Sequence, residues 1–135
     1  MNVQMAVLCD AAADYNGKLS VLGAFDTLFS EALPATHAQC SVALRIVFDR
    51  SEEGLHQLRL SFVNEDGQPI MRAMEIPMDV VFQDDSTFLS RNFVVNIQQL
   101  KLEQEGLYSV DAALDERPFA NIPLLVKRME EPPTA

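Results

Sequence analysis

With 135 residues and a mass of 15.0 kDa, the chain has room for one domain with a single core, and two ordinary domains would not fit. Apolar residues make up 48% and charged residues 22%, so the chain buries enough apolar surface to fold and is not mainly disordered. Ten Lys and Arg against twenty Asp and Glu give a net charge of −10, which excludes nucleic acid and anionic membrane surfaces as partners.

The first predicted elements form a hairpin. Asn16-Gly17 favours a type I′ turn, in which both central residues need positive φ, and it separates residues 3–15 from residues 18–29. The alanines at 11–13 are weak strand formers, so this hairpin is expected to be irregular before its turn. The stretch Ser30–Gln39, which contains Pro34, is then the longest predicted loop.

Alternation of apolar and polar residues with period two dominates the rest of the chain and predicts antiparallel strands with one face in a core. Asp66-Gly67 predicts a second hairpin, between Leu55–Asn64 and Ile70–Val80. The best helical candidate, Ile97–Glu105, is short and uncapped, and no helix is predicted there. The alternating runs are residues 42–48, 58–62, 74–80, 108–114 and 122–126. Polar breaks lie at residues 51–54, 83–86, 103–106 and 115–118.

These elements predict an all-β fold, a two-sheet antiparallel β-sandwich of about seven to nine strands, immunoglobulin-like or C2-like. We expect a single domain over residues 1–129 and a disordered tail at 130–135. Leu102, Gly106, Tyr108 and Val110 are similar in spacing to a tyrosine corner, in which a tyrosine hydroxyl bonds to backbone upstream. The alternative is that Tyr108 is only an aromatic residue on the core face of a strand.

Further motifs give a resemblance that covers residues 3–128. The chain resembles a family of small uncharacterised bacterial all-β proteins, a domain of unknown function. The resemblance implies a compact single-domain protein and brings no substrate, cofactor or catalytic residue with it. The residues that carry it are Asp10, Gly17-Lys18-Leu19, Gly23-Ala24-Phe25-Asp26, Leu33-Pro34, His37, Gly54-Leu55-His56, Asp66-Gly67, Gly106-Leu107-Tyr108-Ser109-Val110 and Ile122-Pro123-Leu124.

The two cysteines, Cys9 and Cys40, are too few for the disulfide framework of a small secreted protein, so we expect two buried, free thiols. The N-terminus lacks the basic start and the long apolar run of a signal peptide. The sequence also has no run of about eighteen apolar residues that could span a bilayer. We therefore expect a cytoplasmic protein that does not bind membranes.

Catalytic motifs are missing. The sequence contains neither a G-x-S-x-G elbow nor a Gly-rich phosphate loop, and its only histidines are His37 and His56. A nucleophile needs a general base within reach, and the sequence does not place either cysteine beside a histidine. We therefore predict no catalytic residues and no enzymatic activity.

Metal sites are weakly indicated. Zinc would need Cys9, His37, Cys40 and His56 together, but only His37-x-x-Cys40 has the spacing of a ligand pair. Calcium would need oxygens from several loops, and the best supply is in the acidic loops. No metal and no cofactor is predicted. The candidate acidic residues are Asp26, Asp49, Asp84-Asp85 and Asp115-Glu116.

Arg72 and Arg91 share the parity of the apolar residues in their predicted strands. A guanidinium on a core face must reach the rim or find an acceptor, so each either extends past the strand end or lines a groove or subunit interface.

The first function hypothesis is a non-enzymatic binding or scaffolding module. The alternative is a ligand- or calcium-binding domain that uses the acidic loops, and a third is a small hydrolase or redox protein. We expect a protein partner or self-association and favour a homodimer, because sandwich edges are sparingly protected, with Pro77 and Pro123 among the few edge breakers. Apolar residues on the outward parity support this: Val47, Val63, Met71, Val94 and Leu125.

Overall fold

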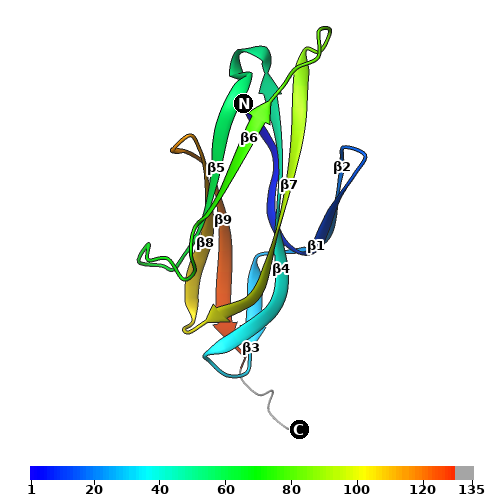
Figure 1. The fold of residues 1–135 in the computed structure, drawn as a ribbon. Helices are drawn as coiled ribbons and strands as arrows, with labels where there is room; N and C mark the ends of the chain where they lie inside the picture. The colour runs from blue at the N-terminus through cyan, green and yellow to red at the C-terminus, as the bar shows by residue number, and fades with distance from the viewer. Residues whose placement is uncertain (130–135) are drawn as a thin grey trace.

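The computed structural model describes residues 1–129, and the predicted tail at 130–135 lies outside the described residues. Nine strands and one short 3-10 turn make up the fold, which confirms the prediction of an all-β sandwich (Figure 1). The elements are β1 (Asn2–Tyr15), β2 (Lys18–Phe25), β3 (Thr27–Ser30), β4 (Ala35–Asp49), η1 (Arg50–Glu52), β5 (Gly54–Val63), β6 (Met74–Val80), β7 (Phe88–Leu102), β8 (Gly106–Leu114) and β9 (Arg117–Arg128). Within residues 1–129, no helix is long and apolar enough to cross a membrane.

The strands form two layers. One sheet has the order β2-β1-β4-β7, which we call sheet A, and the other has the order β3-β9-β8-β5-β6, which we call sheet B. The alternating apolar residues of both sheets meet between the layers, as the sequence pattern predicts. Leu44 and Phe48 of β4 are fully buried there against residues of sheet B such as Leu60, Phe62 and Leu124.

The first hairpin is regular through its turn, because Asn16 and Gly17 both adopt positive φ, at 52° and 79°. Its tip lies against the outer face of sheet A, where Arg45 Nη1 and Asn92 Nδ2 donate hydrogen bonds to the Gly17 carbonyl at 3.0 and 3.1 Å. The contact helps to explain why Ala43, on the outward parity of β4, is fully buried. Sheet A is therefore covered partly by its own hairpin.

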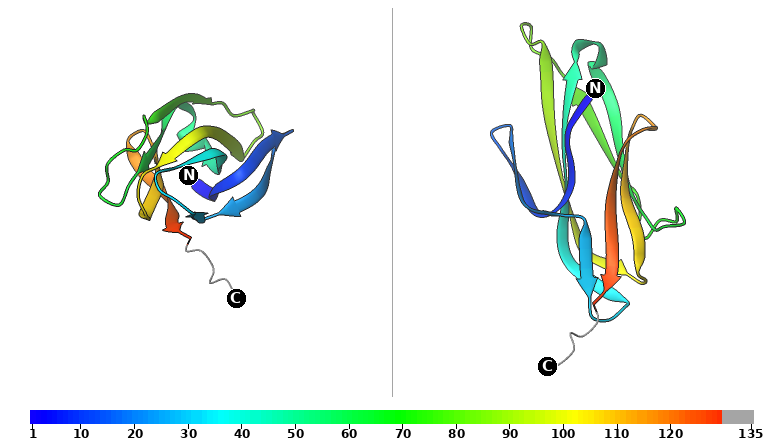
Figure 2. Two further views of the ribbon diagram at one scale, coloured as in Figure 1. Left: turned by 90° about the horizontal axis from the view of Figure 1, so that it is seen from below. Right: turned by 180° about the vertical axis from the view of Figure 1, so that it is seen from behind.

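The chain crosses from sheet A to sheet B between β2 and β3, which closes one side of the sandwich (Figure 2, right). Strand β3 pairs with β9 in parallel, an exception to the antiparallel arrangement that the sequence predicts. Phe25 and Leu28 on either side of the crossing pack against the core. Pro123 of β9 precedes the segment that pairs with β3, which begins at Leu125, so its missing N–H costs no bond to β3.

Three predicted boundaries were wrong. The loop at Ser30–Gln39 shrinks to residues 31–34, because β4 begins at Ala35. The strand expected at Ile70–Val80 begins only at Met74, since a turn around Gly67 is followed by an irregular stretch. The first predicted strand pair also extends less far, because β2 ends at Phe25 and β3 belongs to the other sheet.

Strand β7 contains a kink that the sequence hides. Gln99 adopts a positive φ of 55° within the strand, and the side that faces the core changes there. Ile97 before the kink and both Leu100 and Leu102 after it are therefore buried. The spacing from Ile97 to Leu100 imitates a helical period, which explains the weak helical signal at this position.

Candidate functional site

The structure does not gather the four candidate zinc ligands. Cys9 and Cys40 are buried free thiols, and burial raises the pKa of Cys40 to about 11. His37 faces Phe25 with its ring centroid 6.0 Å away, and its buried Nε2 has no hydrogen-bond partner among residues 1–129. His56 has other partners. Within the described part of the chain, no group of three or more His, Cys, Asp or Glu side chains could hold a metal ion.

His56 joins two parts of the fold that are far apart in sequence. Its Nδ1 lies 2.6 Å from Asp115 Oδ2, and its Nε2 lies 2.5 Å from the Glu52 carbonyl oxygen. The ring also stacks on Phe48 at an interplanar angle of 19°. With an acceptor at each nitrogen, the doubly protonated ring is favoured, and the hydrogen bond with Asp115 is the main cause that raises the pKa of His56.

In this arrangement His56 has a structural role and is not placed to act as a general base, because neither ring nitrogen is left to accept a proton from a substrate. Asp115 is equally occupied, since its Oδ1 accepts the Gln57 backbone N–H at 2.9 Å. Its hydrogen bond with His56 is the first cause that lowers the pKa of Asp115. We call His56, Asp115 and the Glu52 carbonyl together the His56 clamp.

The other candidate calcium residues are separate or already bonded. Asp49 caps the 3-10 turn and accepts the Ser51 N–H at 2.9 Å, and Asp26 accepts the Thr27 hydroxyl at 2.9 Å. Asp84 and Asp85 are exposed in the connection between β6 and β7. The acidic loops therefore do not converge as a site for a hard cation requires.

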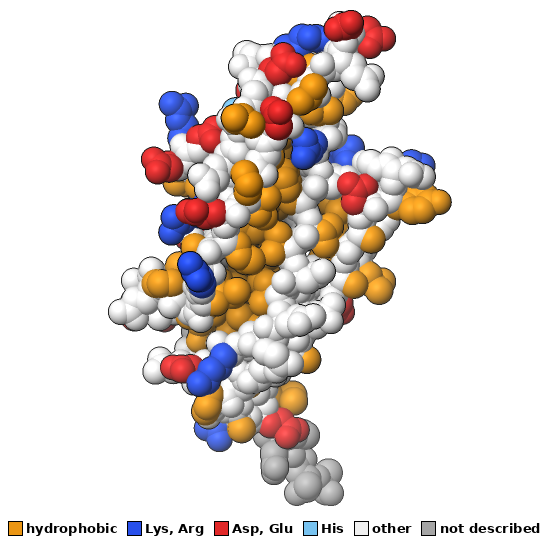
Figure 3. All heavy atoms as spheres, viewed as in Figure 1, with side chains coloured by type: hydrophobic (Ala, Val, Ile, Leu, Met, Phe, Trp, Pro, Cys, Tyr) orange, Lys and Arg blue, Asp and Glu red, His pale blue; other side chains and the backbone are white. Residues whose placement is uncertain are grey.

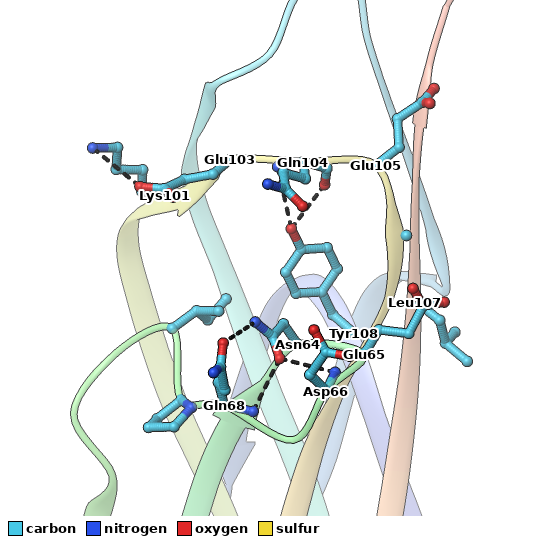
Figure 4. Close-up of a pocket in the computed structure, with 13 residues that line it drawn as sticks. Asn64, Glu65, Asp66, Gln68, Lys101, Glu103, Gln104, Glu105, Leu107 and Tyr108 are labelled. Atoms are coloured by element: carbon cyan, nitrogen blue, oxygen red, sulfur yellow. Dashed lines mark hydrogen bonds and ion pairs between the residues drawn. The ribbon is translucent and has the colours of Figure 1, made fainter.

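The predicted tyrosine corner is confirmed. The Tyr108 hydroxyl donates to the Gln104 carbonyl at 2.7 Å, across the turn between β7 and β8 (Figure 4). Next to it, this turn and the loop after β5 line a pocket of about 480 Å³ that is partly open to solvent. Its acidic lining is partly engaged, because Glu103 pairs with Lys101 at 3.6 Å and Glu105 accepts the Arg128 N–H at 2.5 Å.

The side of the sandwich opposite the β2–β3 crossing is open. Strands β6 and β7 are the end strands of their sheets there, each with one neighbouring strand among residues 1–129. Figure 3 shows hydrophobic side chains in a continuous band between them, which we call the β6–β7 stripe. Half-buried hydrophobic residues from both strands and from the preceding loop pack on the core at this side: Ile70, Met71, Met74, Ile76, Leu89 and Val95.

The two singled-out arginines differ in position. Arg91 faces the core side of β7, as its parity predicts, and crosses to the other sheet, where its Nη1 donates to the Asp79 carbonyl of β6 at 3.1 Å. Arg72 lies exposed in the irregular segment before β6, so its predicted strand position was wrong. Arg91 thus bridges the two edge strands at one end of the stripe.

The apolar residues predicted on the outward parity do not form one surface. All are half-buried. They lie on the outer face of sheet A (Val47, Val94), on the outer face of sheet B (Val63, Leu125) and against the core (Met71). The contact surface that the sequence suggested is therefore not assembled from these residues, and sequence reasoning missed the stripe because its residues belong to the core pattern.

Comparison with known proteins assigns a family. A model described as "Family of unknown function (DUF6941)" matches residues 4–127. The chain belongs to this family. The match confirms the resemblance to an uncharacterised domain and brings no activity with it.

No curated protein matches the chain. Among solved structures, the chain is similar to a glycosyl hydrolase family 2 member from Bacteroides cellulosilyticus DSM 14838, with 14% identity and a TM-score of 0.41. That match covers 68% of this chain and 14% of the hydrolase chain, so the chain spans a small part of the protein it matches.

Proposed function

We propose that this protein is a non-catalytic binding module that accepts an extended strand of a protein partner along its open β6–β7 side. The observation that carries the proposal is the stripe of half-buried core side chains between two edge strands. An added strand gains main-chain hydrogen bonds from an edge and places alternate side chains into the apolar surface. The partner segment is therefore extended, with an apolar residue at every second position.

The side of the sandwich that the β2–β3 crossing closes supports this proposal. There β3 adds to the edge of sheet B as a short strand, while Phe25 and Leu28 cover the core. On the open side, β6 has 7 residues against 15 in β7, so much of β7 has no counterpart of equal length in sheet B. A strand from a partner would cover the stripe as the β2–β3 crossing covers the opposite side.

The test uses phage-displayed random linear peptides selected on the immobilised full chain. Selected peptides should alternate apolar and polar residues, and their binding should be lost in Ile76→Lys, which puts a charge into the stripe. Leu55→Lys is the matched control, because Leu55 is 82% exposed and lies on the outer side of β5. Thermal melting confirms that both variants fold.

Amide exchange of the wild type with a selected peptide supplies a second measurement, which does not depend on any variant. Protection should rise in β7 or β6. The proposal is wrong if no peptide is selected, if the peptides bind Ile76→Lys as well as the wild type, or if protection rises elsewhere only.

A further inference from the structure

Strand β6 turns the backbone groups of Pro77 toward the open side. Across from Pro77 in β5 lies Gln57. The Gln57 N–H donates to Asp115 Oδ1 and the Gln57 carbonyl accepts the Asp115 N–H, both at 2.9 Å. Residues directly opposite each other in an antiparallel pair exchange both hydrogen bonds or neither, so Gln57 makes none with Pro77. The backbone of Pro77 therefore points to the free edge, and Glu75 and Asp79, two residues to either side, point the same way.

This edge of β6 is poorly suited to receive another strand. Pro77, in the middle of β6, has no N–H to donate. The Asp79 carbonyl already accepts the Arg91 guanidinium at 3.1 Å, which agrees with the direction deduced for it. Strand β7, in contrast, has 15 residues and no proline, so every residue that faces its free edge has an N–H. These features favour β7 as the edge that receives an added strand.

Arg91 places a cation beside the apolar residues of the stripe. It pairs with Ile46 of β4, which is fully buried, so the Arg91 side chain lies on the core side of β7. Phe93 and Val95, two and four residues further along, share that side. A guanidinium has five N–H donors, and the bond to the Asp79 carbonyl is the one hydrogen bond that this guanidinium makes within residues 1–129. A carboxylate is the acceptor that best matches the remaining donors.

We infer that the added strand pairs with β7 and carries an acidic residue, Asp or Glu, opposite Arg91. This inference rests on the proposed function, because it names the edge and the partner chemistry at the same surface. Directly opposite residues of paired strands share a face and have Cβ atoms about 4.5–5.5 Å apart, so the carboxylate reaches the guanidinium. The partner residues opposite Leu89, Phe93 and Val95 are apolar, because they cover the stripe.

The overall charge of the chain makes this preference distinctive. With a net charge of −10, the protein repels acidic segments at long range. An acidic residue is therefore disfavoured in a bound segment unless it meets a local cation. Of the two cations in β7, Arg91 lies beside the stripe and Lys101 lies beyond the kink at Gln99. An acidic residue among apolar ones in the partner strand therefore points to Arg91.

The peptides selected by phage display on the full chain test the inference without any protein variant. They should carry Asp or Glu at one of their alternating positions and apolar residues at the others. In calorimetry, replacing that acidic residue by its amide should raise the dissociation constant roughly tenfold, since a charge-assisted hydrogen bond is lost. Amide exchange of the complex should show protection along β7, while the amides of Glu75 and Asp79 in β6 stay unprotected.

Charge reversal locates the contact. Arg91→Glu should weaken binding of the acidic peptide and favour a form with Lys in place of its acidic residue, because the pair is then reversed and still attractive. Lys18→Glu is the matched control, because it makes the same change of net charge at an exposed position of β2, at the opposite end of sheet A, and should leave binding unchanged. If Arg91→Glu fails to fold, the amide form of the peptide on the wild type still decides.

The outcomes separate this inference from the proposed function. The inference is wrong if the selected peptides lack an acidic residue, if the amide form binds as tightly, or if protection rises in β6 and not in β7. Peptides that nevertheless bind in an Ile76-dependent way contradict only this inference, whereas the absence of any selected peptide contradicts both proposals. A wild type that is a dimer with β7 protected before peptide is added identifies a second copy as the occupant and contradicts the acidic partner.

Discussion

Replacing Asp115 by Asn should destabilise the fold most at mildly acidic pH and much less at alkaline pH. The substitution keeps an oxygen for the Gln57 N–H and removes the charge that faces His56. It adds no backbone strain, because Asp115 has a φ of 49° and Asn tolerates this region well. The loss of stability in Asp115→Asn therefore measures the contribution of the His56 clamp.

The magnitude follows from the exposure of the two side chains. A hydrogen bond between charged groups contributes about 1.5–3 kcal/mol when shielded, and an exposed ion pair about 0–1 kcal/mol. The His56 side chain is 16% exposed and that of Asp115 is 48% exposed, which places this pair between the two cases. We expect a loss of about 1 kcal/mol, which lowers Tm by about 3–5 °C in a domain of this size.

The pH window follows from the two pKa shifts. The pKa of His56 is raised above 6.5, so its contribution is complete below pH 6.5 and is lost as the pH rises through the folded-state value. The pKa of Asp115 is lowered below 3.8, so its contribution is complete above pH 3.8 and is lost as the pH falls through the folded-state value. The difference between Asp115→Asn and the wild type should therefore be largest between pH 3.8 and 6.5.

Urea unfolding of both proteins at a series of pH values measures this difference. Glu116→Gln is the control, because it removes a charge from the adjacent residue in the same turn. The remaining ionisable groups are common to all three proteins, so their contributions to the pH dependence cancel in the comparison. A destabilisation by Asp115→Asn that stays constant from pH 5 to pH 9, or that Glu116→Gln reproduces, would refute the reasoning.

Three further outcomes are expected. Tyr108→Phe should lower the free energy of unfolding in urea by about 1–2 kcal/mol, whereas Gln104→Ala should not, because the hydroxyl bonds the Gln104 backbone. Gly17→Ala should lower the free energy of unfolding by about 1 kcal/mol, since the φ of Gly17 is positive but an added Cβ would meet no other atom. Gly23→Ala should lower it by more, because the φ of Gly23 is also positive and an added Cβ would clash with the Asp10 side chain. Thiol titration should find both cysteines unreactive in the native protein and reactive in denaturant; rapid native labelling would contradict their burial.

Local chemistry made much of the fold predictable. Period-two alternation identifies the strands because one face of each meets the core, and Asn16-Gly17 marks a turn because few other pairs accept two positive φ values. Tyr108 could be placed in a corner for a similar reason, since its partner at Gln104 is only four residues away. Each of these signals lies within a short segment of sequence.

The features that were missed depend on distant segments or on single backbone angles. The His56 clamp joins residues 59 positions apart, and no local pattern relates them. The parallel pairing of β3 depends on a crossing between sheets, which alternation does not encode. The kink at Gln99 uses a positive φ at a residue that gives no warning of it, because polar residues other than glycine adopt that region only occasionally.

The wrong strand boundary at Ile70 and the candidate binding surface have one physical origin. Alternation predicts that β6 begins at Ile70, but the backbone leaves the sheet after the turn at Gly67 and returns only at Met74. Ile70 and Met71 still pack on the core from this irregular segment, so their apolar character is used without a strand. A strand over the full predicted length would have extended sheet B along β7 and covered more of the stripe. The shortfall leaves β7 as the longer edge, and for this reason the open side is where the molecule has most to gain from an added strand.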